Sequence, residues 1–217
     1  MVKYRNKNKQ KHRKVHPKIF VWSHTEKAEI EYFQDFKNYL ETPLLMPKKE
    51  LCWKPQELIE KVIKWKREEI YDEDRDQVWC IFDVDDFCCE EQDKVELLRL
   101  IAMAEDNNIK IALMNECFEL WILLHFERLT SPVYRGKDIE KRIQKFFKKN
   151  KLGEFKKNQS VFKTLLPFQA QAISNAKKLL SMDYEKIDWV EILSKNGNPT
   201  TSIHFLIEEI NRLMGKH

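Results

Sequence analysis

An abrupt change from apolar to acidic residues in the middle of the chain constrains its fold most strongly. Residues 78–82 are five consecutive apolar or aromatic residues, and Asp83, Asp85 and Asp86 follow within four positions. A continuous apolar run of this length is typical of a strand buried on both faces, as in a parallel sheet. Open α/β sheets bind ligands beyond the carboxyl ends of their strands, so we expect the three acids to lie where a site would form.

The spacing of these aspartates favours a site for a hard metal ion. Alternate side chains of an extended strand point to the same side, so Asp83 and Asp85 can converge on one cation while Asp86 faces elsewhere. Carboxylate oxygens are the ligands that such cations prefer. A structural interpretation is equally open, in which the acids only end the strand and cap the following helix.

Apolar patterns on either side predict further elements of an α/β fold. Short apolar runs predict strands at residues 19–22, 109–114, and either 44–46 or 51–53. Helical spacing predicts helices over residues 26–40, 55–65, 92–106, 167–182 and 202–214. This alternation predicts a doubly wound, mostly parallel sheet flanked by helices. We expect a basic disordered tail at 1–17, an α/β core at 18–130, and a helical C-terminal extension at 131–217 that packs on the core.

Positive charge is concentrated at the N-terminus. The chain of 217 residues has a formal net charge of +4, and residues 1–18 contain eight Lys or Arg and no acid. Removing these eight charges leaves −4 for residues 19–217. Basic clusters attract polyanions without sequence preference, so we predict RNA or DNA as a partner. A tail that only aids solubility is the alternative.

Cysteine content and hydropathy indicate the compartment. The five cysteines are odd in number and lack C-x-x-C spacing, which favours reduced thiols over a disulfide framework or structural zinc. No apolar run is long enough to span a bilayer, and the basic N-terminus is not followed by a signal-type apolar segment. We therefore expect a soluble cytoplasmic protein with no membrane partner.

Polar exceptions mark an otherwise apolar helix predicted over residues 116–126. Asn115 is placed to cap this helix, and Glu119 and His125 lie within it. An acid or an imidazole in such a helix is costly unless it is paired. We expect each either to form a structural hydrogen bond or to support a functional site.

A basic segment follows at residues 135–157, with ten Lys or Arg against three acids. Helical spacing aligns several of these cations opposite an apolar stripe of Ile139, Ile143 and Phe147. This face could follow a phosphate backbone, or it could simply be a solvated helix surface. Together with Lys27, the candidate nucleic-acid-binding residues are Lys137, Lys141, Arg142, Lys145 and Lys148.

Four sequence signatures are similar to those of one protein family. Residues 23–33 match its pattern E-G-x-K-T-E-x-x-Y-F at Lys27, Glu29, Tyr32 and Phe33, and the aspartate strand is the second signature. Residues 115–126 resemble N-P-x-F-E-x-W-L-L-L-H-F with Glu116 in place of proline, and residues 198–202 resemble N-P-S-T-S. Across residues 18–212, the chain thus resembles RloB-like proteins, the small Toprim-type members of bacterial phage-defence and abortive-infection loci.

The resemblance implies a Toprim core, in which a glutamate and a D-x-D motif hold Mg²⁺ for phosphoryl transfer on nucleic acid. Asp83 and Asp85 match the D-x-D motif, whereas His24 and Thr25 occupy the positions of the glutamate and its following glycine. An imidazole suits Mn²⁺ better than Mg²⁺ and is also a candidate general base. Glu26 could replace the missing carboxylate.

The implied activity is that of a nuclease that uses Mg²⁺ or Mn²⁺. Its candidate catalytic residues are His24, Glu26, Glu29, Asp83, Asp85 and Glu119, and its candidate metal ligands are Asp83, Asp85, Asp86 and Glu26. His24 favours a second hypothesis, a non-catalytic Toprim-derived subunit that binds nucleic acid or a defence partner. The resemblance also implies a neighbouring ATPase of the AAA or ABC type, and self-association into a homo-oligomer is a further expectation.

Overall fold

The computed structural model describes residues 17–23, 28–41, 43–49, 54–69, 71–84, 91–115, 117–130, 136–157, 160–193 and 199–215. Five of the candidate site residues lie outside these ranges: His24, Glu26, Lys27, Asp85 and Asp86.

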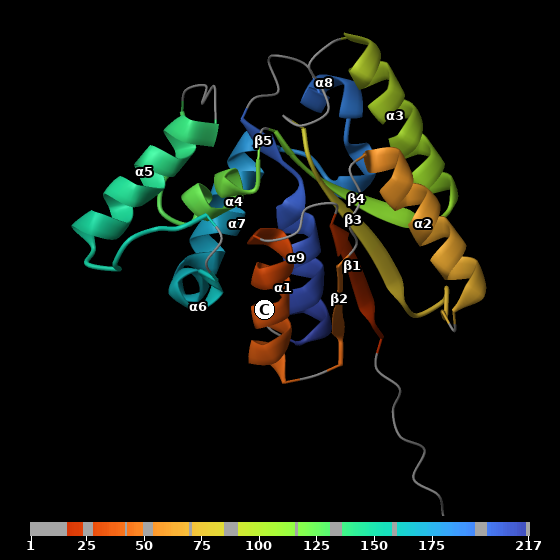
Figure 1. Cartoon of the computed structure of the whole chain (residues 1–217), viewed down its shortest axis with the longest axis horizontal. Helices are drawn as coiled ribbons and strands as arrows, with labels where there is room; N and C mark the ends of the chain where they lie inside the picture. The colour runs from red at the N-terminus through yellow and green to blue at the C-terminus, as the bar shows by residue number, and fades with distance from the viewer. Residues whose placement is uncertain are drawn as a thin grey trace, which may run out of the picture.

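A five-stranded sheet in the order β2-β1-β3-β4-β5 forms the centre of the fold (Figure 1). Strands β1 (Ile19–Ser23), β2 (Leu45–Lys49), β3 (Gln77–Asp83) and β4 (Ile109–Asn115) are parallel. The short β5 (Thr200–Thr201) pairs with β4 in the antiparallel direction. The predicted mostly parallel sheet is confirmed, and β2 overlaps the first of the two alternatives for its segment.

Helices cover both faces of this sheet because its buried strands are apolar on both sides. One face packs Phe20, Cys80 and Phe82 against α2 (Pro55–Glu68) and α3 (Glu91–Asp106). The other face packs Val21 and Ile81 against α1 (Ala28–Leu40) and α9 (Ile203–Leu213). Consecutive strand residues therefore belong to different cores, as the twofold period of a strand requires.

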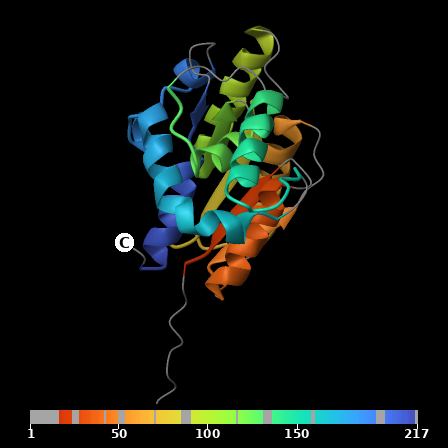
Figure 2. The ribbon, with the colours of Figure 1, turned by 90° about the vertical axis from the view of Figure 1, so that its left-hand side faces the viewer.

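Further helices extend the layer on the α1 and α9 side, which Figure 2 turns toward the viewer. They are α4 (Glu119–Leu124), α5 (Gly136–Lys149), α6 (Phe162–Leu165) and α7 (Gln169–Leu179). Helix α4 contacts both α5 and α7, and α1 contacts α6. The helix predicted at 167–182 begins later than expected, because its first two residues belong to a 3-10 turn, η1 (Leu166–Phe168), that precedes α7. The chain then passes through η2 (Tyr184–Lys186) to α8 (Trp189–Leu193), which contacts α3.

The prediction that Asn115 caps a helix is wrong. Asn115 is the last residue of β4, and α4 begins only at Glu119, after Phe118 at its N-cap position. The Asn115 Nδ2 atom donates a hydrogen bond of 2.9 Å to the Ile192 carbonyl oxygen. The Asn115 side chain therefore holds α8 against the end of β4. The prediction failed because the sheet places Asn115 beside a segment far away in the sequence, which the local pattern does not reveal.

Two predictions about cysteines and membranes can be compared with the described residues. Cys80 and Cys117 are buried thiols rather than half-cystines, and the other three cysteines lie outside the described ranges. None of the described helices combines the length and apolar character needed to cross a membrane.

Candidate metal and nucleic-acid site

The central strands end together at the edge of the sheet that points upward in Figure 1. Ser23 pairs with Ile81 in the register of β1 and β3, and Asp83 pairs with Met114 in that of β3 and β4. Asp83 thus lies two residues beyond the partner of Ser23 on the adjacent strand. Asp83 is the last residue of β3, a central strand of the sheet, as the sequence predicted.

Side-chain alternation places Asp83 on the sheet face that α1 covers. Trp79 and Ile81, four and two residues before Asp83, belong to the core on that face. Ile19 and Val21 do so on β1, which puts Ser23 on the same face. Both polar side chains are buried, with Asp83 only 7% exposed.

Glu29 brings a second buried carboxylate to this end of the sheet. It lies in the first turn of α1 and is 3% exposed. Tyr32, Phe33 and Phe36, at spacings of three, four and seven residues, form the buried side of the helix. Since β1 ends at Ser23 and α1 begins at Ala28, Glu29 lies near the same carboxyl end as Asp83.

The chemistry of these donors fits a divalent cation. Asp83 and Glu29 supply hard carboxylate oxygens, the donors that Mg²⁺ prefers and that Mn²⁺ accepts. Within the described ranges, no group of three or more His, Cys, Asp or Glu side chains is arranged to hold a metal. The ligand set predicted from the sequence also includes Glu26, Asp85 and Asp86, which those ranges omit.

Glu119 is buried in an ion pair. Its Oε1 atom lies 3.3 Å from the Nζ atom of Lys157, which also lies 3.6 Å from Glu140. Burial opposes the charged form of Lys157, but the surrounding negative groups, chiefly the Glu119 carboxylate, together outweigh it and raise the pKa of Lys157 above its usual range. The sequence did not identify Lys157 as this partner. A buried acid predicts that some cation lies beside it, but not which of the many lysines and arginines that cation is.

His125 is buried and structurally bonded. Its Nδ1 atom lies 2.8 Å from the Trp121 carbonyl oxygen, and this nitrogen donates because a carbonyl can only accept. Burial lowers the pKa of His125 to about 4, although hydrogen bonds to the backbone act in the opposite direction. The ring is therefore neutral near pH 7, which agrees with the structural alternative for this residue.

The basic stripe of α5 faces solvent. Lys137, Lys141, Lys145 and Lys148 are exposed, whereas Ile139, Ile143 and Phe147 are buried on the opposite side. Lys141 makes an exposed ion pair with Asp138 at 3.4 Å. The Arg142 guanidinium is bonded to the Glu127 carboxylate, so its charge is already engaged within the protein.

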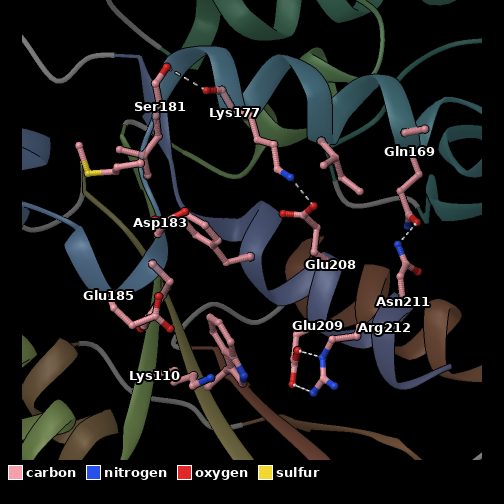
Figure 3. Close-up of a pocket in the computed structure, with 17 residues that line it drawn as sticks. Lys110, Gln169, Lys177, Ser181, Asp183, Glu185, Glu208, Glu209, Asn211 and Arg212 are labelled. Atoms are coloured by element: carbon pink, nitrogen blue, oxygen red, sulfur yellow. Dashed lines mark hydrogen bonds and ion pairs between the residues drawn. The ribbon is translucent and has the colours of Figure 1, made fainter. Parts of the chain in front are cut away.

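A cavity of about 1070 Å³ lies toward the other end of the sheet (Figure 3). It includes Trp79 and Lys110, near the amino ends of β3 and β4, and residues of α7 and α9. Most of its charges are paired internally, as in Lys177 with Glu208 at 2.6 Å and Arg212 with Glu209 at 2.7 Å. This cavity is distinct from the acidic end where Asp83 lies.

A mostly parallel sheet with helices on both faces, and with buried acids at the carboxyl end of its central strands, defines an α/β protein of Toprim-like architecture. The model of the RloB-like protein family matches residues 19–210, and the chain belongs to this family. Comparisons with curated proteins and with solved structures found no significant match.

Proposed function

We propose that this protein is a divalent-metal-dependent nuclease that hydrolyses phosphodiester bonds of RNA or DNA in bacterial anti-phage defence. The observation that carries the proposal is the burial of two carboxylates, Asp83 and Glu29, at the carboxyl end of one sheet face. Buried acids at this edge of an α/β sheet are characteristic of functional sites. Membership of the RloB-like family supports the same assignment.

The proposed roles follow from the chemistry of each side chain. Asp83, Asp85 and Asp86 are the proposed aspartate ligands of Mg²⁺ or Mn²⁺, and Glu29 or Glu26 completes the ligand set. The bound ion supplies Lewis acidity for the charge that develops on phosphate oxygens. His24 accepts a proton from the attacking water, while Lys137, Lys141, Lys145 and Lys148 hold the phosphate backbone. Glu119, paired with Lys157, anchors α4 to the segment after α5 and acts on the site only through the position of that helix.

The test compares Asp83→Asn with Asp183→Asn, a change at an exposed carboxylate beside the distant cavity. Labelled single-stranded and duplex RNA and DNA are incubated with each protein in Mg²⁺, Mn²⁺ or EDTA. Loss of a residue that only hydrogen-bonds a metal ligand commonly lowers activity about 10–100-fold, so loss of the ligand Asp83 itself should lower cleavage at least about 100-fold. Asp183→Asn should cleave like the parent. Equal cleavage by all three proteins would contradict the assignment.

Thermal unfolding gives a second readout that does not require turnover. A cation bound only by the folded state raises the unfolding temperature of the parent, and Asp83→Asn should lose most of this gain. Without metal, the Asp83→Asn variant should be at least as stable as the parent, because the charge of Asp83 no longer repels that of Asp85.

The alternative function is a non-catalytic subunit that binds nucleic acid or another defence protein. His24, at the position where the family pattern has glutamate, favours this alternative. This alternative predicts that the protein binds nucleic acid with or without a metal ion and does not cleave it in the presence of Mg²⁺ or Mn²⁺. An ATPase of the AAA or ABC type as partner, and self-association of the chain, are further proposals that co-purification and measurement of molecular mass would test.

A further inference from the structure

Three phenylalanines form a cluster where α5 meets the end of α4 and the η1 turn. The rings of Phe126 and Phe146 are stacked, with centroids 4.0 Å apart and an interplanar angle of 16°. Phe168 approaches both rings edge-on, at 5.5 Å from Phe126 and 6.4 Å from Phe146. The stacked pair attaches α5 to the body of the protein, and Phe168 forms the outer part of the cluster.

The outer ring is accessible. Phe168 is 37% exposed, and Phe126 and Phe146 are partly buried. Packing α5 against α4 is already achieved by Ile139, Ile143 and Phe147, which are almost fully buried. An exposed aromatic surface beside this core offers a flat apolar face to a ligand.

Cations border this cluster on α5. Lys145 directly precedes Phe146, and Lys149 lies one turn later. Both are exposed, and neither has an ion-pair partner among the residues that the structure describes. Arg142 lies one turn before Phe146 and is bonded to Glu127. One ring, Phe146, and two lysines without ion-pair partners among the described residues, Lys145 and Lys149, therefore lie along one side of the helix.

We propose that Phe168, with Phe146 and Phe126 beneath it, is a stacking platform for a base of a single-stranded nucleic acid whose phosphates contact Lys145 and Lys149. Proteins that bind single strands combine a cationic track with aromatic rings, since every unpaired base has a face that can stack. Bases within a duplex are already stacked on each other and do not reach such a ring. This inference rests on the proposed function and specifies its substrate as single-stranded.

The test measures binding by fluorescence anisotropy in EDTA, so that neither cleavage nor a metal contributes. The full chain and its Phe168→Leu and Phe168→Trp variants are titrated into labelled single-stranded RNA, single-stranded DNA and duplexes of the same sequence. Leucine keeps the apolar packing without a flat face, whereas tryptophan keeps or enlarges that face. We expect Phe168→Leu to bind single strands roughly tenfold more weakly, the size of one lost base stack, and Phe168→Trp to bind like the parent.

Two control variants separate stacking from charge. Tyr39→Leu removes a ring of α1 that is 46% exposed and should leave binding unchanged. Lys145→Gln should weaken binding and reduce its dependence on salt, because fewer counterions are released. Equal binding by parent, Phe168→Leu and Phe168→Trp would overturn the platform, as would equal affinity for duplexes or no oligonucleotide binding at all.

This outcome is independent of the nuclease assay. If Asp83→Asn abolishes cleavage while Phe168→Leu binds normally, the platform is wrong and the nuclease assignment stands. If no metal supports cleavage but Phe168→Leu loses single-strand binding, the platform stands and the nuclease assignment is wrong.

Discussion

The Nζ atom of Lys157 lies 3.3 Å from the Oε1 atom of Glu119, and this contact joins α4 to the segment that follows α5. The Glu119 side chain is almost fully buried, whereas Lys157 remains more than half exposed. A buried carboxylate without a partner lowers the stability of the fold, and the positive charge of Lys157 offsets this cost for Glu119 in its apolar helix.

Lys157→Met should lower the free energy of unfolding by about 2 kcal/mol. Removing one member of a fully buried pair costs about 3–5 kcal/mol, and the exposure of Lys157 reduces this penalty through solvent screening. Urea denaturation at pH 7 measures the change. Adding Glu119→Gln should recover part of the loss, because the uncompensated charge is then absent. Lys156→Met, a change at an exposed neighbour, serves as the control, and an equal loss in that variant would contradict the role of the pair.

Two buried histidines should make the protein less stable in mild acid. Burial lowers the pKa of His125 and of His204 to about 4, and hydrogen bonds to backbone carbonyls only partly oppose this. In the unfolded chain both rings titrate near about 6.5. Stability is therefore fully present above pH 6.5 and is lost as the pH falls toward 4, by up to about 3 kcal/mol for each ring.

Unfolding free energies between pH 7.5 and 4.5 test this sign. His125→Phe should show a flatter dependence than the parent, since only the unfolded state of the parent gains a proton at this position. Carboxylates titrate in both proteins and affect both curves alike. Parallel curves would show that His125 is not protonated preferentially in the unfolded state.

Asn115→Ala should destabilise the protein by roughly 1–3 kcal/mol, because the Ile192 carbonyl loses its buried donor. The loss of stability should be greatest in α8, so the amide hydrogens of this helix should exchange faster with deuterium, as mass spectrometry would measure. Asn150→Ala is a matched control, since its exposed side chain donates a hydrogen bond to the Phe146 carbonyl, one turn earlier in the same helix region, and so joins no distant segment of the described chain. Unchanged exchange in α8 would mean that Asn115 does not hold this helix.

His24→Glu tests how the proposed metal site chooses its ion. If the parent uses the imidazole as a ligand, it should cleave better in Mn²⁺ than in Mg²⁺, and the variant should shift the preference toward Mg²⁺. If the parent is inactive in both ions, restoring the glutamate could create activity. Parent activity that is equal in both ions and unaffected by the substitution would point instead to Glu26 or Glu29 as the ligand.

Much of the sheet was predictable from the sequence, because burial on two faces leaves a direct signal. The apolar runs that end at Trp22, Phe82 and Met114 correspond to β1, β3 and β4, and the helical spacing of Tyr32, Phe33 and Phe36 identified the buried side of α1. The carboxyl-end position of Asp83 followed from the same pattern. These features depend on residues that are close together in the chain.

Partnerships between distant segments were decided only by the tertiary structure. Asn115 was expected to cap a local helix and instead bonds to Ile192, and the cation that neutralises Glu119 is Lys157, one of ten Lys or Arg in residues 135–157. The sequence shows that a buried polar group needs a partner, since leaving it unpaired is costly. Which residue provides that partner depends on how separate elements pack, because the contact forms through space between residues that local periodicity does not relate.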